Sequence, residues 1–237
     1  MEHVQKISNF FFLFLVFINT SSLFANTNKT TQQYAELPIS VQNNYLVKEQ
    51  LKQDCNKIQV VEFFSYACPA CYKIEPEVQQ FKDSIKNNDN IIFKKFPVVF
   101  HEAWKNSAKL FLTIDKLNIN DKFQSYVFNV IQNDISNNLT EYDIRKIIDN
   151  FNQKNPNNKI NGKEFIKVFN LNIINRDVKN AMRLFYALNL TGTPVFIVNA
   201  KYIVSPQYFK KAADIFKTIN KLASSGKIIC SNEKKDY

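Results

Sequence analysis

The feature that most constrains the fold of this chain is an abrupt change of pattern around residue 68. The segment Ile58–Phe64 (IQVVEFF) is β-branched and aromatic, which is typical of a buried strand. From Pro69 onward, apolar side chains recur at helical spacing, and Pro76 falls where it should kink the first turns. Cys68 and Cys71 lie at the junction, in the motif CPAC. The sequence therefore predicts a strand that leads into a helix with two cysteines at its start.

The rest of the chain predicts an α/β fold with a helical insertion. A second strand is expected over residues 91–100, with its end broken by Pro97, and a hairpin over residues 194–199 and 202–204. Between them the spacing is helical throughout, over residues 103–117, 121–133, 140–152, 162–169 and 173–189. Residues 34–42 look extended, and residues 206–224 read as a closing amphipathic helix.

These patterns define the domain boundaries that we expect. The first part of an α/β domain covers residues 26–100, and its second part covers residues 191–226. A compact helical domain over residues 101–190 is inserted between them, because the insertion is too long and too regular for a loop. A C-terminal tail covers residues 227–237.

The first 25 residues have the pattern of an export signal. Lys6 provides a positive start, residues 10–18 (FFFLFLVFI) form an unbroken apolar core, and Ala25 offers a small residue at a cleavage site. The core is shorter than the roughly 20 residues that span a membrane, so cleavage is favoured over an uncleaved anchor. We expect a mature protein outside the cytosol, where cysteines can be oxidised.

Composition excludes some functions. The chain has only three glycines, at positions 162, 192 and 226, from which no glycine-rich phosphate-binding loop can be assembled. Its net charge of +10 accompanies a general excess of Asn, Lys and Ile, which is typical of codon bias. We therefore do not take the charge as evidence for nucleic-acid binding.

The position of the two cysteines has chemical consequences. A thiol at a helix N-terminus meets unpaired backbone N–H groups and the positive end of the helix dipole, which favour the thiolate and lower its pKa. Cys68 is therefore the candidate nucleophile, and Cys71, one turn further on, can attack or release its sulfur. Pro69 suits the first helical turn because its missing N–H would have no partner there.

Two other interpretations of this motif remain open. A structural zinc site needs four ligands, and the other candidates are limited to Cys55, Cys230, His101 and His3, the last of which is lost with the signal. A purely structural disulfide is the other possibility, but so small a ring constrains the unfolded chain little. An exported chain with one CxxC motif at a strand-to-helix junction favours redox chemistry.

Two longer motifs resemble a known family. They are Val61 to Tyr72 (VEFFSYACPACY) and, some 120 residues later, Gly192 to Tyr202 (GTPVFIVNAKY). Together with Phe96 to His101 (FPVVFH) and Trp104, they resemble the DsbA family of exported thiol:disulfide oxidoreductases. The resemblance covers residues 34–226 and is far more specific than a lone CxxC.

The resemblance implies a thioredoxin fold with an inserted helical domain, and no cofactor or metal. It implies that Pro194 is a cis-proline facing a redox-active Cys68–Cys71 disulfide, and that Thr193 pairs through its backbone with an extended substrate. Pro69 and Ala70 join Thr193 as expected substrate-binding residues. Glu62 would be a buried acid that passes a proton to Cys71, with Lys95 as its charge partner.

The function so implied is donation of the Cys68–Cys71 disulfide to reduced or partly folded exported proteins in the periplasm. A DsbB-like membrane partner would reoxidise a monomeric enzyme. A reductase or isomerase, and a redox-inactive peptide-binding module of the same fold, are the alternatives. Many family members have His between the proline and the second cysteine, whereas this chain has Ala70, which predicts a weaker oxidant.

Two cysteines lie outside the motif. In a thioredoxin-like topology, Cys55 precedes the strand that leads to Cys68, and Cys230 follows the closing helix, so both are expected at the end of the sheet remote from the active site. Because exported chains rarely leave cysteines unpaired, we predict a structural Cys55–Cys230 disulfide.

Overall fold

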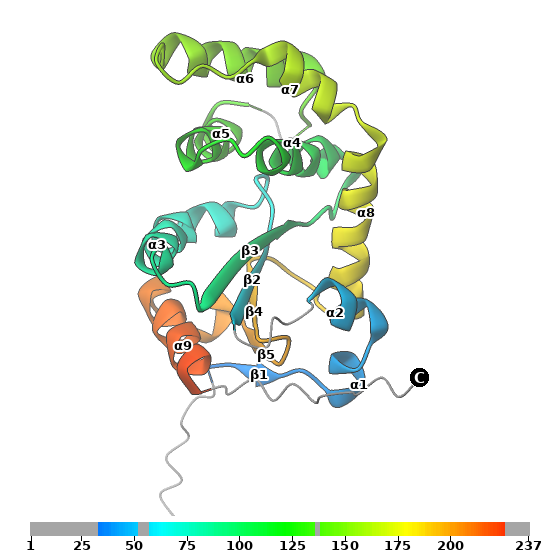
Figure 1. Cartoon of the computed structure of the whole chain (residues 1–237), viewed down its shortest axis with the longest axis vertical. Helices are drawn as coiled ribbons and strands as arrows, with labels where there is room; N and C mark the ends of the chain where they lie inside the picture. Colours follow the sequence, from blue (N-terminus) through cyan, green and yellow to red (C-terminus); the bar gives the residue numbers. More distant parts are fainter. Residues whose placement is uncertain (1–32, 52–56, 136–137, 226–237) are drawn as a thin grey trace, which may run out of the picture. The chain divides into compact units, whose positions relative to one another are not determined.

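The computed structural model describes residues 33–51, 57–135 and 138–225, which form a sheet, helices on both of its faces, and a helical insertion (Figure 1). The elements in chain order are β1 (Ala35–Glu36), α1 (Ile39–Gln42), α2 (Tyr45–Gln50), β2 (Ile58–Phe64), α3 (Pro69–Ile85), β3 (Ile91–Pro97), η1 (Glu102–Trp104), α4 (Lys105–Lys116), α5 (Asp121–Asn133), α6 (Glu141–Lys154), α7 (Gly162–Phe169), α8 (Asn172–Ala187), β4 (Val195–Val198), β5 (Tyr202–Val204), η2 (Pro206–Tyr208) and α9 (Ala212–Ser225). The predicted thioredoxin-like α/β class with a helical insertion is confirmed.

The sheet topology determines where the site lies. The strand order is β1-β5-β4-β2-β3, with β2 parallel to β3 and antiparallel to β4. Phe63 near the end of β2 is paired with Val195 at the start of β4. The residues that follow β2 and those that precede β4 therefore meet at one end of the sheet, although more than 100 positions separate them in the sequence.

Each face of the sheet is covered by a pair of helices. On one face, Val60 and Phe196 pack with buried residues of α3 and α9, such as Val78 and Ile219. On the other face, Val61 and Phe63 pack against α2 and α8. Apart from the buried Gln59 and Glu62 of β2, the strands β2 and β4 are thus apolar on both faces, which explains why they read as hydrophobic runs.

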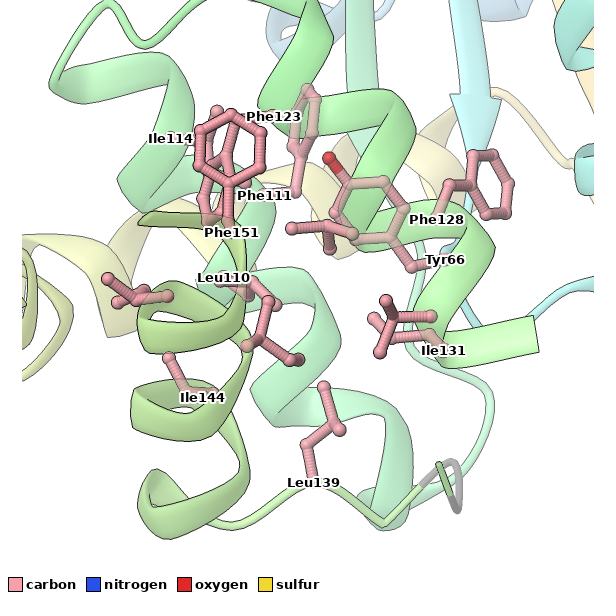
Figure 2. Close-up of a cluster of buried hydrophobic side chains, with 14 of the residues drawn as sticks. Tyr66, Leu110, Phe111, Ile114, Phe123, Phe128, Ile131, Leu139, Ile144 and Phe151 are labelled. Atoms are coloured by element: carbon pink, nitrogen blue, oxygen red, sulfur yellow. The ribbon is translucent and has the colours of Figure 1, made fainter. Parts of the chain in front are cut away.

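The helical insertion has its own aromatic core (Figure 2). Phe123 and Phe151 meet edge to face at 4.9 Å between ring centroids, and both are fully buried. Phe64 and Tyr66, at the end of β2, join this core by edge-to-face contacts with Phe111 and Phe128. The segment just before Cys68 is therefore anchored in the helical insertion.

Two predicted boundaries are wrong, each for a local reason, whereas the second strand ends at Pro97, the residue that was expected to break it and the ladder partner of the last residue of β2, Phe64. The segment 34–42 is a two-residue strand followed by the short helix α1 after Pro38 rather than a continuous extended stretch. The predicted helix over 206–224 is split into η2 and α9, because Phe209 is extended (φ −124°, ψ 140°) and packs against the core.

Helix α2 was not predicted from the sequence. Helix α2 lies in a segment that shows little periodicity, and its start is capped by Asn44, whose side chain accepts the backbone N–H of Leu46 at 2.9 Å. Its single inward residue, Val47, is completely buried against the cluster that contains Leu184. The hairpin turn is as expected, with Asn199 and Ala200 both at positive φ, the conformation that a tight turn between antiparallel strands requires.

Candidate active site

Cys68 is the N-cap of α3. Its backbone is extended (φ −94°, ψ 111°), and its sulfur accepts the backbone N–H of Cys71 at 3.2 Å. Pro69 occupies the first helical position, where no intrahelical donor is needed. Both thiols are free, so the structure represents the dithiol form, in which Cys68 is 5% exposed and Cys71 is fully buried.

The two thiols have opposite proton affinities. Hydrogen bonding by the Cys71 side chain, assisted by the backbone N–H groups of Cys71 and Ala70, outweighs burial and lowers the pKa of Cys68 to about 6. Burial, with the neighbouring Cys68 sulfur and Glu62, raises the pKa of Cys71 well above its ordinary value. At neutral pH the outer sulfur is therefore the thiolate, and the inner sulfur keeps its proton.

The loop before β4 faces the cysteines. The Thr193–Pro194 peptide bond is cis, and the Cys68 sulfur lies 3.6 Å from the carbonyl oxygen of Thr193, to which it donates when it is protonated. Thr193 and Pro194 also line a pocket of about 380 Å³ that Ala70 bounds on the helix side. Thr193 and Ala70, two of the residues expected to bind substrate, thus share one concave surface.

A buried ion cluster lies beneath the cysteines. The Nζ of Lys95 is 3.1 Å from an oxygen of Glu62 and 2.9 Å from an oxygen of Glu75, and these side chains are 7%, 0% and 11% exposed respectively. The second oxygen of Glu75 accepts the Gln79 amide at 2.7 Å. The Lys95 ammonium also lies 4.1 Å from the ring centre of Phe64. One lysine therefore serves two carboxylates, of which Glu62 is the more deeply buried.

This environment affects the proton on Glu62. Burial raises the pKa of Glu62 to about 7, against the opposing charge of Lys95, and the charge of Glu75 adds to the increase. Burial alone would lower the pKa of Lys95, but the two carboxylates together raise it. The cluster thus holds a permanent cation and one carboxyl group that can exchange a proton near neutral pH, close enough to affect Cys71 electrostatically.

The register of β2 and β3 explains why Lys95 lies beside Glu62. Glu62 and Lys95 are direct partners in the parallel ladder of β2 and β3, as their expected pairing requires. Glu75 had no prediction. It follows Cys71 by four residues and is therefore on the same face of α3 as that buried thiol, which was the available signal. Cys55 and Cys230 lie outside the described residues.

The comparisons with known proteins agree with this geometry. A thioredoxin family model matches residues 54–218. The chain belongs to the DsbA family of thioredoxin-like proteins. The thiol:disulfide interchange protein DsbA of Azotobacter vinelandii is 26% identical over 80% of this chain and 80% of its own length, and that of Burkholderia cepacia is 28% identical over 64% and 68%.

The solved structures show the shared fold. The crystal structure of Pseudomonas aeruginosa DsbA superimposes with a TM-score of 0.66 at 23% identity, covering 81% of this chain and 91% of that one. Within this family framework, Ala70 contributes only a backbone N–H to the Cys68 sulfur. None of the helices in the described part of the chain is long and apolar enough to cross a bilayer.

Proposed function

We propose that this protein is an exported thiol:disulfide oxidoreductase that donates its Cys68–Cys71 disulfide to folding substrate proteins. The observation that carries the proposal is the asymmetry of the two thiols, an outer sulfur with a pKa of about 6 and a buried inner sulfur whose pKa is raised. A stable Cys68 thiolate favours the reduced form of the couple, and a protein with such a couple oxidises others. The DsbA relatives are named as thiol:disulfide interchange proteins, in keeping with this activity.

The reaction is an exchange of one disulfide for another. A substrate thiolate attacks the Cys68 sulfur, the Cys68–Cys71 bond breaks, and Cys71 leaves as a thiolate that takes a proton. The second substrate thiolate then attacks the substrate sulfur of the mixed disulfide and releases Cys68 as a thiolate. The substrate gains a disulfide, two electrons pass to the cysteine pair, and one of the two substrate protons ends on Cys71.

Each of the remaining site residues has a proposed role. Glu62, with a pKa of about 7, supplies the proton to Cys71, and Lys95 with Glu75 holds the charge of the cluster. Thr193, before the cis Pro194, pairs through its backbone with the extended substrate, while Pro69 and Ala70 contact it from the helix.

The cellular setting is part of the same proposal. The protein acts in the periplasm as a monomer after removal of the signal at residue 25, and a membrane protein of the DsbB kind reoxidises it. The α/β domain comprises residues 26–100 and 191–226, the helical domain comprises residues 101–190, and residues 227–237 form a tail.

Turnover assays test this function. The oxidised protein should restore activity to a reduced, unfolded ribonuclease in stoichiometric amounts without another oxidant, and catalytically when oxidised glutathione is supplied. Reduction of insulin by the dithiol form without such refolding would indicate a reductase. Activity in neither assay would indicate a peptide-binding module.

A further inference from the structure

The pocket beside Cys68 has a chemical lining that bears on which substrates the protein can bind. It lies between the loop 189–195 and the segment 203–208, and Ala70 closes its third side. Because Thr193 and Ala70 line it and the Thr193 carbonyl lies 3.6 Å from the Cys68 sulfur, the pocket is within reach of the residues that flank a substrate cysteine reacting there. This inference rests on the proposed function, since it concerns the substrate of that reaction.

The pocket wall offers hydrogen-bond donors. Hydroxyl groups are present on Thr191, Ser205 and Tyr208, and Gln207 adds an amide. Gln207 and Tyr208 are exposed, Tyr208 at 44%. No carboxylate belongs to the described residues that form this wall. A wall of donors without an anion is complementary to an acceptor that carries negative charge.

Positive charge lies next to this wall. Lys210 and Lys211 follow Tyr208 by two and three residues, so their Cα atoms lie within about 8 and 11 Å of it. Both are exposed, and neither forms an ion pair with any residue in the described ranges. The nearest carboxylate along the chain, Asp214, is paired with Lys217 at 2.9 Å. The charge of Lys210 and Lys211 is therefore exposed to solvent, not compensated by an ion pair, and within a few residues of the pocket wall.

We propose that this basic rim, Lys210 and Lys211 with Tyr208, selects substrates whose reacting cysteine is flanked by aspartate or glutamate. The carboxylate accepts hydrogen bonds from the pocket wall, and the two ammonium groups attract the acidic segment before it binds. Attraction of this kind increases association rates by about 10-fold or more at low ionic strength and is lost as salt screens it.

Three synthetic dithiol peptides provide the test. They differ only in the residues on either side of the first cysteine, which are Asp, Asn or Lys, and their oxidation by the disulfide form is followed at ionic strengths of about 10 and 500 mM. We expect the Asp peptide to react about 10-fold faster than the Lys peptide at low salt, with the Asn peptide between them. At high salt the three rates should converge.

Variants separate local from overall charge. Lys210→Gln/Lys211→Gln should reduce the Asp-to-Lys ratio to below about 3, because it removes the rim charge. Lys167→Gln/Lys221→Gln removes the same charge from exposed positions outside the pocket and should keep the ratio. Equal oxidation rates for the three peptides at low salt overturn the proposal. So does an equal fall of the Asp-to-Lys rate ratio in both double variants.

Dithiothreitol, which is uncharged, distinguishes a failure of the acidic selectivity from a failure of the proposed function. If it reduces the disulfide form at the same rate in all proteins while the peptides show no preference, only the acidic selectivity is wrong. If it does not react with the disulfide form, the proposed function itself is wrong.

Discussion

The backbone N–H of Cys71 donates to the sulfur of Cys68 over 3.2 Å, at the first turn of the helix that β2 leads into. The donor and the acceptor belong to the two halves of the motif, so the inner cysteine stabilises the outer thiolate while its own thiol stays buried. This relationship determines which sulfur reacts with other molecules and makes the exchange directional.

The pH dependence of alkylation measures this stabilisation. The reaction of the reduced protein with iodoacetamide should follow a single titration with a midpoint near pH 6, because only the thiolate is nucleophilic and the pKa of Cys68 is about 6. Cys71→Ala should raise that midpoint, since hydrogen bonding by the Cys71 side chain is the largest cause of the low pKa. Cys71→Ser, which keeps a donor, is the matched control. Peptide mapping that finds Cys71 labelled before Cys68 would contradict the assignment.

Single replacements separate the roles of the two cysteines. Cys68→Ser should abolish disulfide donation, whereas Cys71→Ser should trap mixed disulfides with substrates, because only the outer sulfur is accessible and has a lowered pKa. Non-reducing gels with thiol trapping at low pH distinguish the two outcomes. Equal trapping by both variants would mean that either sulfur can accept the substrate.

Ala70 provides a test of how the helix start sets the reduction potential. Ala70→His should raise the potential of the couple by about 30 mV, since a donor worth about 1.4 kcal/mol to the Cys68 thiolate stabilises the reduced form by that amount. Ala70→Leu, which adds bulk without a donor, should leave the potential near that of the wild type. Equilibration with glutathione buffers gives both values. An unchanged or lower potential for the histidine variant would show that a donor at position 70 does not stabilise the Cys68 thiolate.

The predicted Cys55–Cys230 disulfide can be checked by mass spectrometry. It would close a loop of about 175 residues, for which chain entropy gives up to about 5 kcal/mol of stabilisation. Non-reduced digests should contain the linked pair of peptides together with the Cys68–Cys71 bond. Finding both thiols free beside an intact Cys68–Cys71 bond would defeat the prediction.

Patterns within single elements were sufficient for much of the fold. The buried strand Ile58–Phe64, the helix after it and the helices of the insertion have apolar spacing that only one secondary structure satisfies. Helix α2 and the break at Phe209 depend instead on tertiary contacts, since Val47 and Phe209 are held by residues distant in sequence. The local sequence pattern indicates which secondary structure a segment can form, and tertiary packing determines where that helix or strand ends.

The site shows the same division. Cys68 and Cys71 are only three positions apart in the sequence, so their chemistry was evident from their position at a helix start. Glu75 was missed because its partner, Lys95, is 20 residues away, and only the ladder between β2 and β3 brings Lys95 beneath the helix. The basic rim belongs to no motif either, since Lys210 and Lys211 gain their significance only from Tyr208, two and three residues before them, which lines the same pocket as Thr193.

The proton on Glu62 makes stability depend on pH. Its pKa is raised to about 7 in the folded protein from an ordinary value of 4.5, so the unfolded chain releases this proton first as pH rises. The stability contributed by the protonated carboxyl is therefore complete below pH 4.5 and is lost between pH 4.5 and 7. Since one pKa unit corresponds to about 1.4 kcal/mol, the total loss is up to about 3 kcal/mol.

Glu62→Gln should remove that loss in the reduced protein. Lys95 keeps its partner Glu75 at 2.9 Å, so the substitution leaves no unpaired buried cation. Urea unfolding should show the variant more stable than the wild type by about 1 to 3 kcal/mol at pH 8, with the difference vanishing near pH 4. Asp83→Asn, on the exposed side of α3, is the control and should change stability little at either pH. A variant less stable than the wild type at pH 8 would instead show that ionised Glu62 and Lys95 form a net stabilising pair.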